Sequence, residues 1–457
     1  MNMGGQYRRA FDWRLSAPGR VPARALSFAT HKLSQPEHLE LLEELLSISR
    51  RRRNNGAVLA RLQLWLLGEV TGDEIAVKGL KKLAEQKGLN LDGGDSQAID
   101  DATVKLRGAV ENGLHFHRVR ANCIRQIGDG IAWRSFGYDR AVMRLLSQRA
   151  TKQQTLAEGT VHELQEWART FDDSKGVSIF NAITNALAIG DVTVLRPDGS
   201  GEIIEVKASN AKSRRLTRQK RKMREVVELL NYGHGEVDER ELTILRLDIE
   251  PGNDLNVLLG LLDRASNDGW SAGRINACCY VECMNATALK NSKEAIGGFE
   301  ASKETEARPL IAAGDDIVEM TSLDVLAFTP NCMPFSVFPF PAKCCVELMS
   351  GILSYKSYFN VSAFFRELEK SGWKFKRNPA QIAAESRGFA APTDAIGEVE
   401  KDGMRITIPP GYVLRMQMEM LRPSVIVKEL EELKKLGLQT HPRWNFVLYG
   451  RESEIWD

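Results

Sequence analysis

The chain has 457 residues, about three times the length of a usual single domain, which predicts two or three domains and a large core. Its composition, with 43% hydrophobic and 27% charged residues, excludes disordered, collagen-like and disulfide-framework proteins. Lys and Arg number 62 against 60 Asp and Glu, so the net charge of +2 does not by itself indicate a nucleic-acid or acidic-membrane partner.

Targeting signals and cysteine motifs are missing from the sequence. The opening residues lack the apolar segment of a signal peptide, and no apolar run approaches the roughly 20 residues that cross a bilayer. The seven cysteines contain no CxxC spacing, which argues against a zinc ribbon or a redox motif. We therefore expect a cytoplasmic protein with reduced thiols and no membrane partner.

Residues 1–150 are predicted to form a mostly helical N-terminal domain. Apolar residues recur at helical spacing in PEHLELLEELLSI and AVLARLQLWLLGEV. We interpret the run from Arg50 to Arg53 as exposed side chains that complement the dipole of a helix C-terminus. His115 and His117 alternate in GLHFHRV and are expected on one face of a strand. No third ligand stands at a recognised spacing, so we expect core or surface histidines there.

Residues 151–260 are predicted to form a compact α/β or α+β unit. The helical stretch TKQQTLAEGTVHELQEWARTF is followed by SIFNAITNALAIG, which has the pattern of a second helix. DVTVL and EIIEVKAS are rich in β-branched residues and are joined by the turn RPDGSG, so we expect a hairpin. A basic helix, KSRRLTRQKRKMREVVELLN, and a strand, ELTILRLDI, complete the unit.

Residues 261–457 are predicted to form a mixed α/β region for recognition or assembly. A helix in LNVLLGLLDRA lies just before this boundary. Within the region we expect a strand in INACCYVECM, a Pro- and Phe-rich stretch and a helix in VIVKELEELKKLG. The fold class expected for the whole chain is α/β, and α+β overall.

Three residues of the predicted hairpin suggest chemistry. Asp191 begins one strand, and Glu205 and Lys207 lie two apart near the end of the next, so their side chains point to one face. Two converging carboxylates make a hard-oxygen site for Mg²⁺ or Mn²⁺, and the neighbouring ammonium can orient or deprotonate an attacking water. Hydrolysis of a phosphodiester needs this combination.

Asp191 followed by Glu205-Val206-Lys207 resembles the active-site signature of the PD-(D/E)XK nuclease superfamily. The resemblance covers residues from about Glu158 to Leu247 and implies a restriction-endonuclease-like core, a mixed sheet flanked by helices. Two other acidic-x-Lys triplets, Glu85 to Lys87 and Glu432 to Lys434, lie in helical stretches and do not fit it.

The resemblance also assigns residues outside the hairpin. The segment from Glu158 to Glu163 is similar to the RecB-like form of the first helix, which makes His162 or Glu163, but not both, a further metal ligand. Gln219 occupies the position of a glutamine that touches the site or the DNA backbone. Similar nucleases have a strand before the one that carries Asp191, so either a short strand lies near 177–180 or this chain is elaborated there.

Eight cations and no acidic residue lie between positions 212 and 224. Backbone phosphates of DNA would offset their mutual repulsion. The alternative is a solvated helix face paired with Glu225 and Glu228. The expected nucleic-acid-binding residues are Lys212, Arg214, Arg215, Arg218, Lys220, Arg221, Lys222 and Arg224.

The expected function is a Mg²⁺-dependent endonuclease that acts on DNA, in prokaryotic restriction, repair or anti-phage defence. Two alternatives remain open: a DNA-binding or assembly subunit that keeps the fold but does not cut, and an RNA-directed nuclease. A protein partner or a second copy of the chain would control the activity through the terminal regions.

Overall fold

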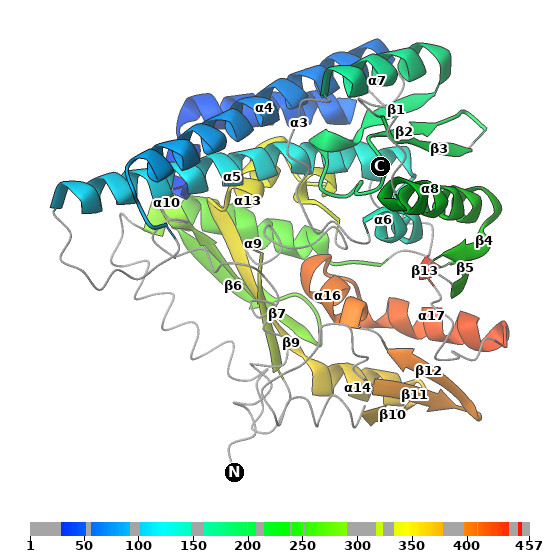
Figure 1. Cartoon of the computed structure of the whole chain (residues 1–457). Coiled ribbons are helices and arrows are strands. Elements are labelled where there is room, and N and C mark those ends of the chain that lie inside the picture. Colours follow the sequence, from blue (N-terminus) through cyan, green and yellow to red (C-terminus); the bar gives the residue numbers. More distant parts are fainter. Residues whose placement is uncertain are drawn as a thin grey trace.

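The computed structural model describes residues 29–51, 56–91, 101–147, 160–174, 176–198, 200–206, 214–237, 240–247, 249, 252–289, 317–322, 333–377, 397–408, 410–437 and 447–449. Over these residues the protein is a mixed α+β structure of long helices and several small sheets (Figure 1). No helix in these ranges is both long and apolar enough to cross a membrane.

The N-terminal region is helical, as predicted. Its described elements are α3 (Pro36–Arg51), α4 (Gly56–Gln86), α5 (Asp101–Ser135) and α6 (Arg140–Ser147). The two long helices, α4 and α5, lie side by side across the molecule (Figure 1).

The strand predicted around His115 and His117 was wrong, because both residues lie within α5. His115 is buried, and His117 Nδ1 lies 2.7 Å from Oδ1 of Asp73 on α4. The seven letters of GLHFHRV are too short a window to reveal helical periodicity, which the apolar contacts of α5 with α4 impose over a longer stretch.

The central region runs in the order helix, three strands, helix, two strands. Its elements are α7 (Thr160–Ser174), β1 (Val177–Phe180), η3 (Asn181–Ile183), β2 (Val192–Leu195), β3 (Gly201–Ile204), α8 (Arg214–Tyr232), β4 (His234–Val237) and β5 (Arg240–Arg246). Strands β1, β2 and β3 form an antiparallel sheet in that order. Helix α7 contacts β1 and β2, whereas α8 contacts β3 and β4 (Figure 1).

The helix predicted in SIFNAITNALAIG was wrong, since the segment contains strand β1 and a single 3-10 turn. The backbone groups of this segment bond to side chains, some nearby and some distant in sequence, and not to one another as in a helix. Asn181 Nδ2 donates to the carbonyl oxygens of Ile189 and Gly190. Asp129 of α5 accepts the backbone N–H groups of Asn185 and Ala186. A short strand therefore does precede the strand next to Asp191, as one of the two expectations for 177–180 required.

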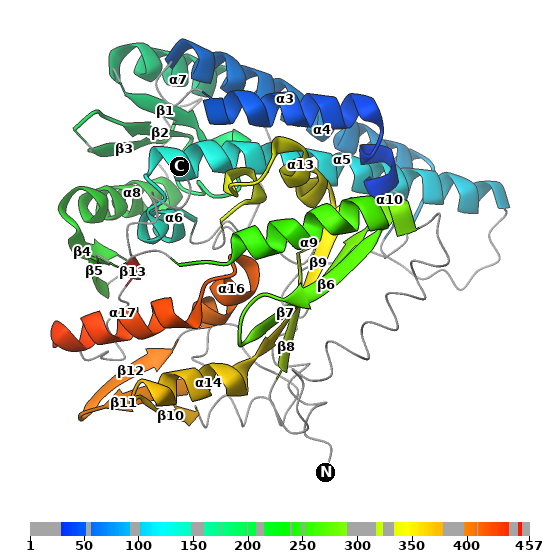
Figure 2. The same ribbon diagram turned by 180° about the vertical axis from the view of Figure 1, so that it is seen from behind.

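The remaining elements follow β5 along the chain and include both helices and strands (Figure 2). They are α9 (Leu255–Asp268), β6 (Trp270–Arg274), β7 (Cys279–Asn285), α10 (Ala286–Leu289), β8 (Ile317–Thr321), η6 (Phe335–Val337), α13 (Ala342–Ser350), β9 (Leu353–Asn360), α14 (Val361–Lys370), β10 (Lys374–Arg377), β11 (Gly397–Lys401), β12 (Met404–Ile408), α16 (Pro410–Met418), α17 (Pro423–Lys435) and β13 (Val447–Tyr449). The predicted helices in LNVLLGLLDRA and VIVKELEELKKLG and the predicted strand in INACCYVECM are confirmed.

The other described strands form three further sheets. One has the order β6-β7-β9-β8, a second the order β10-β11-β12, and a third the order β13-β5-β4. Strand β13 runs parallel to β5, which ties residues near the C-terminus to the central region. Strands β4 and β5 belong to this third sheet, and α8 contacts both β3 and β4.

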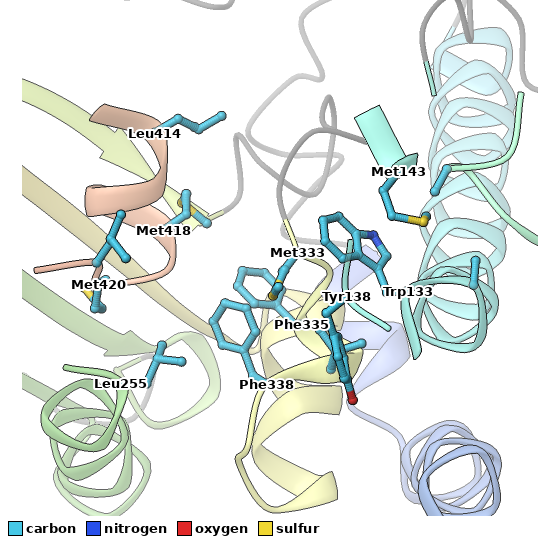
Figure 3. Close-up of a cluster of buried hydrophobic side chains, with 14 of the residues drawn as sticks. Trp133, Tyr138, Met143, Leu255, Met333, Phe335, Phe338, Leu414, Met418 and Met420 are labelled. Carbon is cyan, nitrogen blue, oxygen red and sulfur yellow. The ribbon is translucent and has the colours of Figure 1, made fainter. Parts of the chain in front are cut away.

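A single hydrophobic cluster extends from Leu33 to Leu433 and joins all three regions. Figure 3 shows part of it, where Trp133 of α5 and Tyr138 approach Met333 and Phe335. The six cysteines in the described ranges are free and buried among these residues, as expected for reduced thiols.

The Pro- and Phe-rich stretch is held by an arginine. Arg50 donates to the carbonyl oxygens of Ser336, Phe338 (2.8 Å) and Phe340 (2.6 Å). Arg134 of α5 also donates to the Ser336 carbonyl, at 2.8 Å. The expectation that Arg50 is an exposed residue complementing the dipole of its own helix was wrong, because its guanidinium instead satisfies carbonyls of a segment almost 300 positions along the chain.

Candidate functional site

The predicted hairpin is present and brings two carboxylates together. Val192 pairs with Ile204 in the antiparallel register of β2 and β3, and this is the last pair of the ladder at that end. The backbone N–H of Asp191 donates to the Ile204 carbonyl at 2.8 Å, one residue off the register, so the ladder ends in an irregular step. Asp191, directly before β2, and Glu205, directly after β3, therefore lie at the same end of the hairpin.

Gly190 makes the approach to Asp191 possible. Its φ is +72°, and a Cβ atom there would lie 2.5 Å from Ile203 Cγ2 and 2.9 Å from the Ile204 carbonyl oxygen. Only glycine fits both the left-handed backbone and the closeness of β3. The side chain of Asp191 is held as well, because its Oδ2 accepts the backbone N–H of Val206 at 2.7 Å.

Helix α7 contributes the third carboxylate. Glu163 is half-buried, and burial together with the negative charges of Asp191 and Glu205 raises the pKa of its carboxyl to about 7. Trp167, one turn further along α7, is buried and donates its Nε1–H to the Ser178 carbonyl of β1 at 3.1 Å. This bond fixes α7 against the sheet, and with it the position of Glu163.

His162 occupies a different place from Glu163. It is exposed and lines a cavity of about 440 Å³ between α7 and the end of β3. Adjacent residues of a helix point about 100° apart, so His162 and Glu163 approach the hairpin from different directions. Glu163 interacts electrostatically with Asp191 and Glu205, and His162 shares a cavity with Glu205.

The Asp191 and Glu205 carboxylates are the groups at this site that suit a hard cation. Mg²⁺ prefers oxygen ligands and needs only one or two protein carboxylates when water and a substrate phosphate complete its shell, so this pair fits Mg²⁺ or Mn²⁺. In the described residues, no three or more His, Cys, Asp and Glu side chains are grouped closely enough to hold a metal ion. Glu163 therefore acts on the pair through its charge and does not complete a closed set of ligands with it.

Several predicted site residues fall outside what can be described. Lys207 and Lys212 lie outside the described residues. Six more of the predicted residues lie in α8, where the structure describes their backbone but not their side chains: Arg214, Arg215, Arg218, Gln219, Lys220 and Lys222. Arg221 and Arg224 are exposed on α8, and Arg221 Nε lies 3.3 Å from Glu225 Oε1. Glu225 is thus one of the two acidic partners expected for a solvated helix face.

Two residues of the N-terminal helices support the site, and sequence reasoning missed both. Gln63 of α4 is buried, donates to the Ser178 carbonyl and accepts the Phe180 N–H, each at 2.9 Å. It satisfies two backbone groups on the edge of β1 that faces away from β2, as another strand would. Asp129 of α5 holds the segment between β1 and β2, as described above. Polar residues on the apolar faces of α4 and α5 were the only signal for them.

The cavity beside Glu205 was also missed. Its walls are formed by four residues of α7 and the end of β3, namely His162, Gln165, Glu166, Arg169, Ile204, Glu205 and Val206. The four α7 residues are spaced i, i+3, i+4 and i+7, the spacing of one helix face, which the sequence did contain.

Comparison of the chain with protein-family models, with curated proteins and with solved structures gives no match.

Proposed function

We propose that the protein is a metal-dependent nuclease that hydrolyses phosphodiester bonds in DNA. The observation that carries the proposal is the presence of Asp191 and Glu205 at one end of the β2–β3 hairpin, with Glu163 of α7 near enough to interact electrostatically with both. Helix α8, which contacts β3, has a strongly cationic sequence. The order of α7, three antiparallel strands and α8 supports a restriction-endonuclease-like core for residues 151–260.

Each group in the cluster has a proposed role. Asp191 and Glu205 would hold Mg²⁺ or Mn²⁺, which supplies positive charge for the phosphate and favours ionisation of water. The Val206 N–H keeps one oxygen of Asp191 turned toward Glu205. Lys207, two residues after Glu205, would orient or deprotonate the attacking water. Gln219 and the cations of α8 would hold the DNA backbone.

The proposed setting is the cytoplasm of a prokaryote, in restriction, repair or anti-phage defence. This setting is an analogy with nucleases that carry similar motifs, since fold and site do not determine it. A protein partner or a second copy of the chain would dock on the regions outside 151–260 and license cutting.

Incubation of the full chain with plasmid and linear DNA in Mg²⁺ or Mn²⁺ tests the proposal. We expect Glu205→Gln to lower the cleavage rate by at least about a hundredfold, the scale of removing one charged group from a catalytic site. Lys207→Ala should lower it similarly. Glu202→Gln is the matched control, because Glu202 lies in β3, three residues before Glu205, but pairs with Arg196 on the surface. Cutting that survives both site substitutions would refute the assignment.

The same experiment separates the alternatives. Salt-sensitive DNA binding without cleavage of any substrate would support a nuclease-fold subunit that does not cut. Faster digestion of RNA than of DNA of the same sequence would support an RNA-directed nuclease. The first result would remove the catalytic roles proposed for Asp191 and Glu205, whereas the second would keep them and change the substrate.

A further inference from the structure

The cavity between α7 and β3 adjoins the proposed catalytic carboxylates. Its volume of about 440 Å³ lies within the range of pockets that hold small ligands. Glu205 lines this cavity and is also one of the carboxylates proposed to bind the metal ion. A group bound in the cavity therefore lies directly beside the bond that the proposed nuclease would cut.

The α7 wall of the cavity is polar and linear. From His162 to Arg169 it extends about 10 Å, at a rise of about 1.5 Å per residue. Gln165 offers both a donor and an acceptor to the edge of a base, and a guanidinium such as that of Arg169 suits a phosphate. These groups match one nucleotide better than an apolar ligand, because five of the seven described lining residues are polar or charged and the other two are Ile204 and Val206.

Arg169 is held in place but can be released. Its Nη2 lies 2.5 Å and its Nε 3.1 Å from the two carboxylate oxygens of Glu166. The Arg169 side chain is 59% exposed, so this ion pair is weak and its exchange for a phosphate costs little.

A duplex cannot use such a cavity without opening. In paired DNA the base next to the cleaved phosphate is stacked inside the helix, and it reaches a pocket only after unpairing. A single strand presents its bases freely. We propose that this cavity binds the nucleotide next to the scissile phosphate, and that the protein therefore cuts single-stranded DNA in preference to duplex. The proposal rests on the proposed nuclease function.

Cleavage of one labelled oligonucleotide, free and annealed to its complement, tests the preference in Mn²⁺. We expect wild type to cut the free strand with a kcat/KM at least about tenfold higher. Gln165→Trp fills the cavity from an exposed helix position, and we expect it to raise KM for the free strand about tenfold, the scale of lost base contacts, with duplex cutting unchanged.

Arg169→Ala and Arg196→Ala form a matched pair. Each arginine is exposed and pairs with a glutamate, Glu166 or Glu202, but only Arg169 lines the cavity. We expect Arg169→Ala to raise KM for the free strand and Arg196→Ala to leave it as in wild type. Equal cutting of free and paired strands, or wild-type behaviour of Gln165→Trp, would overturn the proposal.

Binding gives a readout that does not depend on cutting. If wild type cuts no DNA, the nuclease function fails, and fluorescence anisotropy of the labelled single strand in Ca²⁺ then tests the cavity alone. Binding weakened about tenfold by Gln165→Trp, but not by Arg196→Ala, supports a nucleotide site. Equal binding by all three proteins contradicts it.

Discussion

At the scale of single residues, the position of Asp191 depends on neighbours that have no part in chemistry. Gly190 allows the close approach of β3, Asn181 donates to the carbonyl oxygens just before Asp191, and Asp129 holds the preceding loop. Each of these residues satisfies backbone groups or fits a space that no other residue type would fit. Changes at Gly190 and Asp129 should therefore be measurable in stability before any activity is assayed.

Gly190→Ala is predicted to destabilise the protein more than the same substitution at a glycine that has a positive φ but open space around it. Gly137→Ala is the matched control, because Gly137 has a φ of +60° with no atom within 4 Å of a Cβ there. We expect a loss of about 1 kcal/mol for the control and a further 1–3 kcal/mol for Gly190→Ala, from the clash with Ile203. Urea unfolding measures both, and equal losses would show that β3 can move away.

Asp129 should make stability depend on pH. Burial raises the pKa of its carboxyl from 3.8 to about 6, although the N–H groups of Ala186 and Asn185 oppose the shift. The folded state therefore binds the carboxyl proton of Asp129 more tightly than the unfolded state does. Proton binding at Asp129 thus stabilises the folded state fully below about pH 4, and this stabilisation is lost as the pH rises to about 6.

The isosteric variant Asp129→Asn isolates this effect. Its amide stays neutral, and its Oδ1 can keep both backbone hydrogen bonds. We expect its free energy of unfolding to rise relative to wild type by on the order of 2 kcal/mol between pH 4 and pH 6. Urea unfolding at several pH values measures the difference, and a difference that does not change with pH would contradict the assignment.

At the scale of elements, two arginine-rich segments have different roles. Arg50, at the end of α3, is occupied by three carbonyl oxygens of the segment around η6. Arg221 and Arg224 on α8 are exposed. Among these described residues, Arg221 and Arg224 leave their guanidinium groups accessible to phosphate and Arg50 does not, so Arg50 and the α8 arginines should respond differently to substitution.

Arg50→Lys is predicted to destabilise the fold. A lysine has no planar fork and cannot donate to Ser336, Phe338 and Phe340 together, so buried carbonyls lose their partners at a cost of about 1–3 kcal/mol. Arg118→Lys, at an exposed position of α5, serves as the control and should change stability by less than about 0.5 kcal/mol. Thermal unfolding of both variants measures the two losses of stability, and equal losses would contradict the role of Arg50.

Arg221→Gln combined with Arg224→Gln is predicted to weaken DNA binding in a salt-dependent way. Each lost phosphate contact should lower the slope of log K against log salt by about 0.7 to 0.9. Lys428→Gln with Lys435→Gln on α17 removes the same charge elsewhere and should leave the slope as it is. Anisotropy titrations in Ca²⁺ at several salt concentrations give the slopes, and identical slopes for the two double variants would exclude α8 from the interface.

At the scale of the whole molecule, the proposed nuclease core depends on the regions around it. Gln63 of α4 bonds two backbone groups on the free edge of β1, and the Ala188 N–H donates to the Leu146 carbonyl of α6. The backbone of α5 comes so near η3 that a Cβ at Gly128 would lie 2.0 Å from the Ile183 carbonyl oxygen. Arg140 of α6 forms a buried ion pair of 2.6 Å with Glu419.

The fragment 151–260 is therefore predicted not to fold alone. Without α4 and α5 it exposes the apolar residues of β1 and leaves the Ser178 carbonyl and Phe180 N–H without Gln63. We expect no cooperative thermal transition for the fragment and one for the full chain, followed by near-ultraviolet circular dichroism. A sharp transition of the fragment would favour the division into three domains that the length predicted.

The hairpin could be predicted from sequence because its signals are local. Alternation in DVTVL and EIIEVKAS and the turn between them specify pairing within 15 residues. The residues that complete the site, Glu163 and Gln63, lie on helices whose placement depends on contacts across the core. Likewise, the strand at 177–180 was hidden because its hydrogen-bond partners include Gln63, more than 100 positions away.

The sequence by itself determined the helical N-terminal region, the Asp191 and Glu205 hairpin and the cationic α8, because periodicity and turn residues act over a few positions. The tertiary structure decided that the charge of Glu163 acts on both hairpin carboxylates while His162 lines the cavity beside Glu205, that Arg50 binds carbonyl oxygens, and that this cavity has a polar wall. These outcomes depend on how α7 and α3 are rotated about their axes. Burial of apolar faces in one continuous core sets that rotation, and no local pattern encodes it.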